Sequence, residues 1–320
     1  MVNTVFEVIK PGLATSVQDL GRTGFQQYGV VVSGAMDDFA LQVGNSLVGN
    51  PRAAAGLEIV IMGPELRIIK DTVLAICGAD LSPKLDGLEI PLWTSIFVKA
   101  GQTLQFGQSK DGGYAYITVA GGVDTPIVMG SRATYTKAEL GGFHGRNLQK
   151  GDRLNSGNYL EASLKRRSGL SLSPGMIPNY KADGKIRVVL GPDHKAFDEQ
   201  STQTFLSESY QVTTKSDRMG YRLTGPKLSH VFGADIISDA VFPGTIQVPA
   251  NGEPIILLAD RQTTGGYTRI ATVISIDLPH VVQSLPGTKI QFAAISVEEA
   301  QALYVQQEKL LRILSVGAYK

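Results

Sequence analysis

The amino-acid sequence predicts a mainly β fold divided into two domains, with a few short helices. The 36 glycines separate short runs rich in Val, Ile, Thr, Phe and Tyr, a pattern typical of many strands joined by tight turns. The chain has 320 residues, 43% of them hydrophobic, which suits two hydrophobic cores better than one. Between about Asn155 and Gly184 the composition shifts to Ser, Gly, Pro, Lys and Arg without a strand or helix period, and we place the domain boundary there.

This interpretation divides the chain into four regions. We expect an N-terminal β domain over residues 1–160, a linker over 161–184, a C-terminal β domain over 185–295 and a C-terminal helix over 296–320. Three glycine-containing turns predict hairpins, at Asp86-Gly87, at Asp111-Gly112-Gly113 and at Asn251-Gly252. Asp-Gly and Asn-Gly pairs favour hairpins because both residues accept positive φ angles.

Two segments have helical spacing instead. From Met36 to Leu47 the apolar residues recur on one side, and Gly49 supplies a stop. Ser296 and Glu299 have the spacing of a capping box, in which each side chain bonds the backbone N–H of the other residue. We expect the buried side of this C-terminal helix to carry Ala300, Leu303, Leu310 and Leu314.

Charge and cysteine content exclude several classes of protein. The net charge is only +1, from 30 basic and 29 acidic residues, so no long-range field favours binding to nucleic acid. The basic cluster Lys165-Arg166-Arg167 is best interpreted as part of a solvated tether. Cys77 is the single cysteine, which rules out an internal disulfide framework and favours the cytoplasm. No apolar run is long enough to span a bilayer, so we expect no membrane partner.

Known catalytic motifs are missing, and the isolated polar residues have ordinary structural interpretations. There is no phosphate loop, zinc-binding His-Glu-x-x-His helix or nucleophile elbow, and the four histidines have no ligand spacing. We therefore expect no metal site. His144 is interpreted as a hydrogen-bonding surface residue, and Cys77 as a small core residue inside an apolar strand.

The first candidate site precedes the predicted helix at Met36. Arg22, together with backbone N–H groups near Ser33 and Gly34, could hold a carboxylate or phosphate at the helix N-terminus. The alternative, which the sequence alone favours, is that Ser33 caps the helix and that Asp19 pairs with Arg22 to hold a turn.

The second candidate site lies in the segment from Ser216 to Leu223. Arg218 offers a planar fork for an anion, and Asp217 could move a proton or orient a base. A structural ion pair across a turn would use the same residue types, and the sequence leaves the two interpretations open.

The third candidate site, between Leu257 and Tyr267, carries more polar residues than a hairpin turn needs. Such an excess between two apolar strands favours a site. The excess comprises an acid, a cation, an amide, two hydroxyls and a phenol, which are Asp260, Arg261, Gln262, Thr263, Thr264 and Tyr267. The paired glycines Gly265 and Gly266 would by themselves indicate only a backbone requirement.

These stretches also carry a resemblance to a known family. The runs Pro11–Arg22, Ser33–Asp37, Ser216–Leu223 and Gly244–Pro249, with Asp260–Tyr267, resemble the biotin-dependent carboxyltransferase-like family, also called allophanate hydrolase subunit 2-like. The resemblance extends from about residue 8 to about residue 295. It implies two cyclophilin-like β-barrel domains. The sequence departs from the family pattern at Cys77, where a hydroxyl residue is commoner, and at Thr268, where proline is usual.

The resemblance also implies a function and partners. Family members of this length are typically the C component of ATP-dependent 5-oxoprolinase, which works with subunits A and B to open 5-oxoproline to glutamate. Larger relatives are carboxyltransferase regions of urea carboxylase, and another member antagonises an inhibitor of a histidine kinase. This chain has no Ala-Met-Lys-Met motif for covalent biotin. We expect ATP as the cosubstrate, held mainly by a partner protein, and a chain that is inactive alone.

The expected roles follow from the chemistry of opening a lactam. Asp217, Arg218, Asp260 and Tyr267 are the predicted catalytic residues, because the reaction needs proton transfer and stabilisation of developing negative charge. The predicted substrate-binding residues are Asp19, Arg22, Ser33, Gly34, Gln262, Thr263, Thr264 and Gly265.

Overall fold

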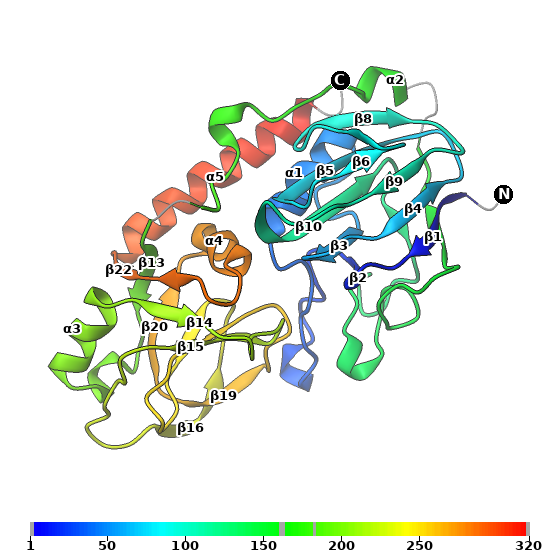
Figure 1. The fold of residues 1–320 in the computed structure, drawn as a ribbon. Coiled ribbons are helices and arrows are strands. Elements are labelled where there is room, and N and C mark those ends of the chain that lie inside the picture. Colours follow the sequence, from blue (N-terminus) through cyan, green and yellow to red (C-terminus); the bar gives the residue numbers. More distant parts are fainter. Residues whose placement is uncertain (1–2, 160–163, 182–183, 318–320) are drawn as a thin grey trace. The chain divides into compact units, whose positions relative to one another are not determined.

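The computed structural model describes residues 3–159, 164–181 and 184–317 (Figure 1). Residues 1–2, 160–163, 182–183 and 318–320 lie outside the described residues, and they include parts of the expected N-terminal domain, linker and C-terminal helix. The chain forms two compact units. Unit 1 comprises Met1–Arg22, Ser33–Lys181 and Lys309–Lys320, and unit 2 comprises Thr23–Val32 and Ala182–Glu308.

Unit 1 contains two antiparallel sheets. A seven-stranded sheet has the order β11-β12-β1-β4-β9-β6-β7, and a five-stranded sheet has the order β2-β3-β10-β5-β8. The strands are β1 (Thr4–Lys10), β2 (Ala14–Gln18), β3 (Gly56–Val60), β4 (Glu65–Ile68), β5 (Thr72–Asp80), β6 (Lys84–Leu85), β7 (Leu88–Glu89), β8 (Ser95–Val98), β9 (Thr103–Gln105), β10 (Asp111–Val119), β11 (Val123–Asp124) and β12 (Arg153–Ser156).

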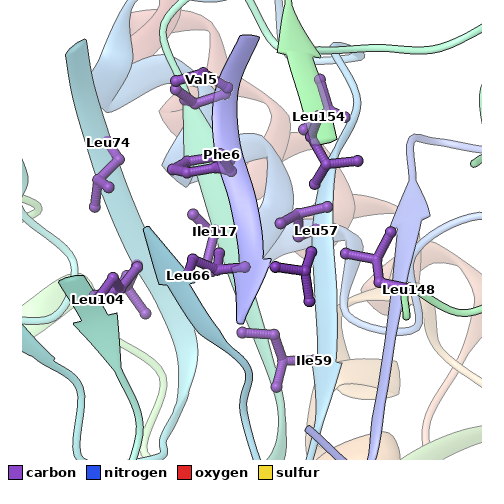
Figure 2. Close-up of a cluster of buried hydrophobic side chains, with 14 of the residues drawn as sticks. Val5, Phe6, Leu57, Ile59, Leu66, Leu74, Leu104, Ile117, Leu148 and Leu154 are labelled. Carbon is purple, nitrogen blue, oxygen red and sulfur yellow. The ribbon is translucent and has the colours of Figure 1, made fainter. Parts of the chain in front are cut away.

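The hydrophobic core of unit 1 lies between these sheets. Figure 2 shows Phe6 of β1, Leu66 of β4 and Leu104 of β9 gathered with side chains of the other sheet. Leu57 of β3 and Ile117 of β10 are among those side chains, and all five are fully buried. Because the apolar residues of both sheets face each other, burying them supplies most of the driving force for this architecture.

Helix α1 (Asp38–Val48) packs on β5 and β10. It begins at Asp37, whose side chain accepts a hydrogen bond from the Ala40 N–H, and it ends at Gly49, where φ is +82°. The predicted helix is therefore confirmed, but the expectation that Ser33 caps it is wrong. Ser33 lies four residues upstream of the cap with φ of +58°, so its side chain does not reach the first turn.

Unit 2 is built on an eight-stranded sheet of order β21-β14-β15-β18-β17-β20-β13-β22, in which only β13 and β22 pair in parallel. Its strands are β13 (Ile186–Leu190), β14 (Tyr210–Val212), β15 (Gly220–Thr224), β17 (Thr245–Gln247), β18 (Ile255–Leu257), β20 (Arg269–Val273), β21 (Lys289–Ile290) and β22 (Phe292–Ala294). Helices α3 (Glu199–Ser207) and α4 (Leu278–Gln283) accompany it. Phe205 of α3 stacks on Phe292, with ring centroids 4.5 Å apart, inside this core.

A separate two-stranded sheet in unit 2 joins β16 (Asp235–Ala240) to β19 (Thr264–Tyr267). Strand β18 precedes β19 in the chain, yet it pairs with β15 and β17 and not with β19. The segment between Leu257 and Thr264 is therefore a crossover from one sheet to another and not a hairpin turn.

The hairpin predictions have mixed outcomes. The turn at Asp86-Gly87 joins β6 to β7, and Asn251-Gly252 lies between the paired strands β17 and β18, so both are confirmed. The third prediction is wrong, because Asp111-Gly112-Gly113 lies inside β10, which pairs with β3 and β5.

The described part of the expected linker packs against unit 1. Helix α2 (Leu164–Arg167) contacts β8, and the Leu172 N–H donates to the carbonyl of Trp93. The Arg167 guanidinium lies so close to Gly49 that an added Cβ there would be 2.3 Å from its Cζ. A cation at the C-terminus of α1 is stabilised by the helix dipole. The interpretation of Arg167 as part of a solvated tether is therefore wrong.

Helix α5 (Val297–Gly317) starts at the predicted capping box. The Glu299 carboxylate accepts from the Ser296 N–H at 2.9 Å, and the Ser296 hydroxyl accepts from the Glu299 N–H at 3.1 Å. This prediction is confirmed. The predicted apolar side is only half-buried, and Leu311, which the prediction did not include, is the residue buried there.

The mainly β fold class is confirmed by the sheets of both units. No helix within the described ranges combines the length and the apolar content needed to cross a bilayer.

Candidate functional site

The second and third candidate segments meet in unit 2 because β15 and β18 pair. Gly220 lies opposite Leu257 in this register, which brings the residues just before β15 beside the residues just after β18. Arg218 donates from Nε to Oδ2 of Asp260 at 2.9 Å and from Nη2 to Oδ1 at 3.1 Å. The Asp260 side chain is 7% exposed. A bidentate, largely buried pair of this kind fixes both side chains in one geometry.

Asp217 shapes the turn that leads into β15. Its Oδ1 accepts from the Met219 N–H at 2.8 Å and from the Gly220 N–H at 3.3 Å. Aspartate commonly bonds the backbone two residues on in turns. The residue is exposed, so its side chain stays within reach of a molecule in solution.

Gly265 of β19 makes room for a buried amide. Gln247 of β17 is 2% exposed and donates from Nε2 to the carbonyl of Tyr267 at 3.1 Å. A Cβ on Gly265 would lie 2.4 Å from this Nε2. The glycine is therefore required by the close approach of Gln247, a residue for which the sequence pattern indicated no role.

Tyr267 lines a pocket of about 590 Å³ in unit 2. Arg222 and Lys215 supply positive charge to its wall, and Glu253 supplies a carboxylate. The uncharged polar residues of its lining, besides Tyr267, are Thr213, Thr214, Thr224 and Asn251. Arg218 and Asp260 are not among its lining residues. Of the predicted catalytic residues, Tyr267 therefore lines this pocket, whereas Arg218 and Asp260 pair outside it.

Thr268, next to Tyr267, replaces the proline that the resemblance leads us to expect. Its backbone N–H donates to the Ala234 carbonyl at 2.9 Å, and its hydroxyl lies 3.0 Å from Nε2 of His230. Proline has no N–H and could not make the first bond. The link between β19 and β20 is thus held by a hydrogen bond that a proline at this position would remove.

The crossover residues 261–264 present several hydrogen-bond donors. Gln262 and Thr263 are half-exposed and Thr264 is exposed. Arg261 is 7% exposed, and burial lowers the pKa of its guanidinium to about 10. Arg261 lies inside the segment singled out from the sequence but received no role there, because its burial could not be inferred from residue order.

In unit 1, Asp19 organises a loop. Its Oδ1 accepts from the Gly21 N–H at 2.8 Å and from the Ser131 hydroxyl at 2.7 Å, and its Oδ2 accepts from the Arg132 N–H at 2.6 Å. The expected pairing of Asp19 with Arg22 is therefore not what holds this turn. Asp19 is 8% exposed.

Arg22, Ser33 and Gly34 lie close to one another in the same loop region of unit 1. Arg22 is fully buried and donates to the carbonyl of Ala133, and the Ser33 hydroxyl donates to the carbonyl of Thr134 at 2.9 Å. A Cβ on Gly34 would lie 2.8 Å from the backbone nitrogen of Gly21. Arg22 and Ser33, on either side of the segment 23–32, thus both bond to the neighbouring residues Ala133 and Thr134. Their contact with substrate remains a prediction.

The start of α1 is occupied by protein acceptors that were not predicted from the sequence. The Glu58 carboxylate accepts from the Met36 N–H at 2.8 Å and from the Tyr116 hydroxyl at 2.7 Å. The Tyr116 oxygen in turn accepts from the Asp37 N–H at 2.8 Å. Burial, followed by the charges of Glu58 and Asp37, raises the pKa of Tyr116 well above its usual value. The N–H groups of Met36 and Asp37, which directly precede α1, are therefore already bonded to protein acceptors.

A signal for this network was present in the sequence. Glu58 stands between apolar neighbours in the strand-like run Leu57–Val60, and a carboxylate at such a position needs buried partners.

Other candidate groups have structural surroundings. Cys77 is fully buried, and burial, followed by the charge of Asp37, raises the pKa of its thiol well above the usual value. A thiol of this kind is a core residue and not a nucleophile. His144 is exposed, as expected. Within the described residues, no group of three or more His, Cys, Asp or Glu side chains could hold a metal ion.

The sequence matches a family model, and the match covers most of both units. Residues 28–294 match the model described as the carboxyltransferase domain, subdomain A and B. The chain belongs to this carboxyltransferase family. The resemblance stated from the sequence is thereby confirmed.

Two kinds of relative stand out. The chain is 38% identical to the C subunit of 5-oxoprolinase from Escherichia coli (strain K12) over 313 residues, which cover 97% of this chain and 98% of that relative. It is 33% identical to the urea amidolyase of Saccharomyces cerevisiae, covering 97% of this chain but 18% of the relative. Among solved structures, the K. lactis urea amidolyase superposes with a TM-score of 0.87 at 31% identity, over 98% of this chain and 20% of that one.

Proposed function

We propose that this carboxyltransferase-family chain is the C component of an ATP-dependent 5-oxoprolinase, acting with subunits A and B to convert 5-oxoproline to L-glutamate. The observation that carries the proposal is the end-to-end match to the C subunit of a 5-oxoprolinase, which covers 97% of this chain and 98% of the relative. A second relative of the same name, from Haemophilus influenzae, matches over 92% of both chains.

The proposed chemistry begins with activation of the lactam. Transfer of the terminal phosphoryl group of ATP to the amide oxygen releases ADP and makes that oxygen part of a good leaving group. A first water then adds to the same carbon, and the ring C–N bond breaks while the nitrogen takes up a proton, which leaves an acyl phosphate. A second water displaces phosphate from this acyl phosphate to give glutamate. Each well-placed donor to the developing negative charge supplies about 3–4 kcal/mol.

Residues of unit 2 would serve this reaction from two places. In the crossover, Gln262 and Thr264 would orient the ring, while the bidentate Arg218–Asp260 pair would position that segment. Tyr267 would contribute from the pocket that also contains Arg222. Subunits A and B would hold most of the nucleotide, since this chain has no phosphate loop.

The decisive experiment is reconstitution with omission. The chain is mixed with cognate subunits A and B, and ATP-dependent glutamate release from 5-oxoproline is measured with each component left out in turn. We expect release only from the complete mixture. Full turnover without this chain, or no turnover by a stably assembled complete mixture, would contradict the proposal.

The site assignment is tested in the same assay. We expect Asp260→Asn and Arg218→Ala each to lower turnover by about 100-fold, because each breaks the bidentate pair that would position Gln262 and Thr264. Retention of full turnover by both variants would remove these residues from the mechanism.

A second function is favoured by the superposition on urea amidolyase. In that case the chain would transfer a carboxyl group from biotin carried by another protein, and activity would depend on bicarbonate. Avidin separates the two possibilities, because it would stop carboxyl transfer and leave 5-oxoproline cleavage unchanged.

A further inference from the structure

Arg261 differs from the partly buried arginines of unit 2, because it does not pair with a carboxylate. Arg187 pairs with Asp277, Arg218 with Asp260, and Arg269 with Asp193 and Asp239. Arg261, at 7% exposure, makes no ion pair with any described residue. Its Nε and Nη1 donate to the carbonyls of Val241 and Leu258 at 3.2 and 3.3 Å, which are long hydrogen bonds to uncharged acceptors.

An uncompensated buried charge is unfavourable for the protein that carries it. Buried cations are normally paired with an anion, because desolvation otherwise penalises the charged form. Burial is also the cause that lowers the pKa of Arg261 to about 10. The guanidinium is still protonated at neutral pH. The crossover therefore contains one positive charge that no carboxylate of the described residues neutralises.

Residues 262–264, which follow Arg261, carry further hydrogen-bond donors that bond to no described acceptor. The backbone N–H groups of Gln262 and Thr263 donate to no other described group, and neither do the hydroxyls of Thr263 and Thr264. Nη2 of Arg261 has no hydrogen-bond partner among the described residues and is not fully enclosed. One cation and several adjoining donors create a local positive potential suited to an oxyanion.

The single positive charge of Arg261 indicates which kind of oxyanion this segment would bind. Gln262, Thr263 and Thr264 are uncharged, and the adjacent Asp260 is engaged by Arg218. A single positive charge balances a monoanionic carboxylate, whereas a nucleotide triphosphate carries several negative charges and is usually accompanied by further cations.

We propose that the guanidinium of Arg261 and the backbone N–H groups of Gln262 and Thr263 bind the carboxylate of a small metabolite. The inference deepens the proposed function, and it rests on that function only for naming 5-oxoproline as the carboxylate. Arg261 thereby anchors the ligand by its charge, while Arg218 and Asp260 hold the start of the crossover in place.

Binding to the full chain alone tests this site without any turnover. Calorimetric titration and thermal unfolding are measured with 5-oxoproline, acetate, inorganic phosphate and ATP as separate probes. The variants are Arg261→Met, which keeps the length but removes the charge, and Arg261→Lys, which keeps the charge with fewer donors. Arg187→Met is the matched control, since it removes a paired arginine from the same unit.

We expect 5-oxoproline to bind the natural chain and raise its Tm, and Arg261→Met to weaken that binding about tenfold or more. Without ligand, Arg261→Met should have a Tm equal to or above that of the natural chain, because an unpaired buried charge has gone. Arg187→Met should lower the ligand-free Tm yet keep the shift produced by 5-oxoproline. Arg261→Lys should bind with intermediate affinity.

Three results would overturn the proposal. One is binding of 5-oxoproline by Arg261→Met, or by Arg261→Lys if the first variant does not fold, with unchanged affinity. Another is Arg261-dependent binding of phosphate or ATP but not of either carboxylate. The third is no carboxylate binding by the natural chain. Loss of glutamate release in the reconstituted complex, with binding intact, would instead count against the proposed function alone.

Discussion

Single residues of unit 2 divide into those that hold the fold and those open to a ligand. Arg218 and Asp260 belong to the first kind as far as their contacts go, because each satisfies the other in a bidentate pair. Arg261 belongs to the second, because its bonds reach only carbonyl oxygens. Asp260 and Arg261 are adjacent in the chain, yet the first has an ion-pair partner and the second donates only to uncharged carbonyl groups.

We expect Arg218→Met to destabilise the protein by about 3 kcal/mol, since it removes the bidentate arginine bound to a largely buried carboxylate. The free energy of unfolding in urea measures this. The matched control is Arg153→Met. The Arg153 side chain is 64% exposed and lies 3.7 Å from Glu7, so its removal should change the free energy by less than about 1 kcal/mol. Equal effects of the two substitutions would contradict the structural importance of the Arg218–Asp260 pair.

The two adjacent glycines of β19 allow a sharper comparison. Gly265→Ala would place a Cβ 2.4 Å from Nε2 of the buried Gln247, whereas Gly266→Ala would meet nothing closer than the Ser238 hydroxyl at 3.5 Å. We expect the first substitution to lower the free energy of unfolding by about 1–3 kcal/mol and the second to change it little. Denaturant unfolding of both variants checks the difference, and a larger loss for Gly266→Ala would refute it.

The sequence shows which segments are rich in polar residues, but not which of these residues are buried. The polar excess from Asp260 to Tyr267 and the turn residues around Asp217 could be located in the sequence, and their roles in a site remain predictions. The isolation of Arg261 was not, because it depends on carbonyl groups at Val241 and Leu258 that only the folded chain brings near it.

At the scale of elements, the start of α5 carries a pH-dependent contact. Hydrogen bonds from the Ser296 backbone, then from its side chain, lower the pKa of Glu299. A lowered pKa in the folded state means that the contribution is present above the unfolded-state value of about 4.3 and is lost as pH falls through the folded value.

We expect Glu299→Gln to remove this dependence, because glutamine can bond the Ser296 N–H but does not titrate. The stability difference between the natural chain and Glu299→Gln should be present at about pH 6 and absent at about pH 3, as measured by urea midpoints. Glu298→Gln is the control, since this neighbouring exposed acid takes no part in the capping box. A difference that grows as the solution becomes more acidic would contradict the assignment.

Whether a segment forms a helix or a strand was easier to predict than which residue caps the helix or which strand pairs with it. The helices at α1 and α5 followed from apolar spacing and from cap residues, yet the cap of α1 is Asp37 and not Ser33, because Ser33 has a left-handed conformation. The polar run after β18 was interpreted as lying between two neighbouring strands. It connects two different sheets instead, and strand pairing at long range is not encoded in local pattern.

At the scale of the whole molecule, the mainly β architecture followed from glycine punctuation and β-rich runs. The inclusion of Thr23–Val32 in unit 2, between two stretches of unit 1, left no trace in the composition. Such an excursion depends on which surface the segment contacts after folding, and a local sequence window contains no information about that surface.

The order in which the chain visits its units limits how the protein can be divided. It runs through unit 1, unit 2, unit 1, unit 2 and unit 1, so four chain crossings link the two. A single cut between residues 181 and 182 would separate Thr23–Val32 from the rest of unit 2. The same cut would separate the part of α5 from Lys309 onward, which contains the buried Leu311, from the rest of unit 1.

Neither fragment would therefore contain a complete unit, so a single break in the chain at this point does not separate unit 1 from unit 2. Additional domains can be joined most simply before or after the whole segment. The longer relatives fit this constraint, because the urea amidolyase of Saccharomyces cerevisiae matches 97% of this chain within only 18% of its own length.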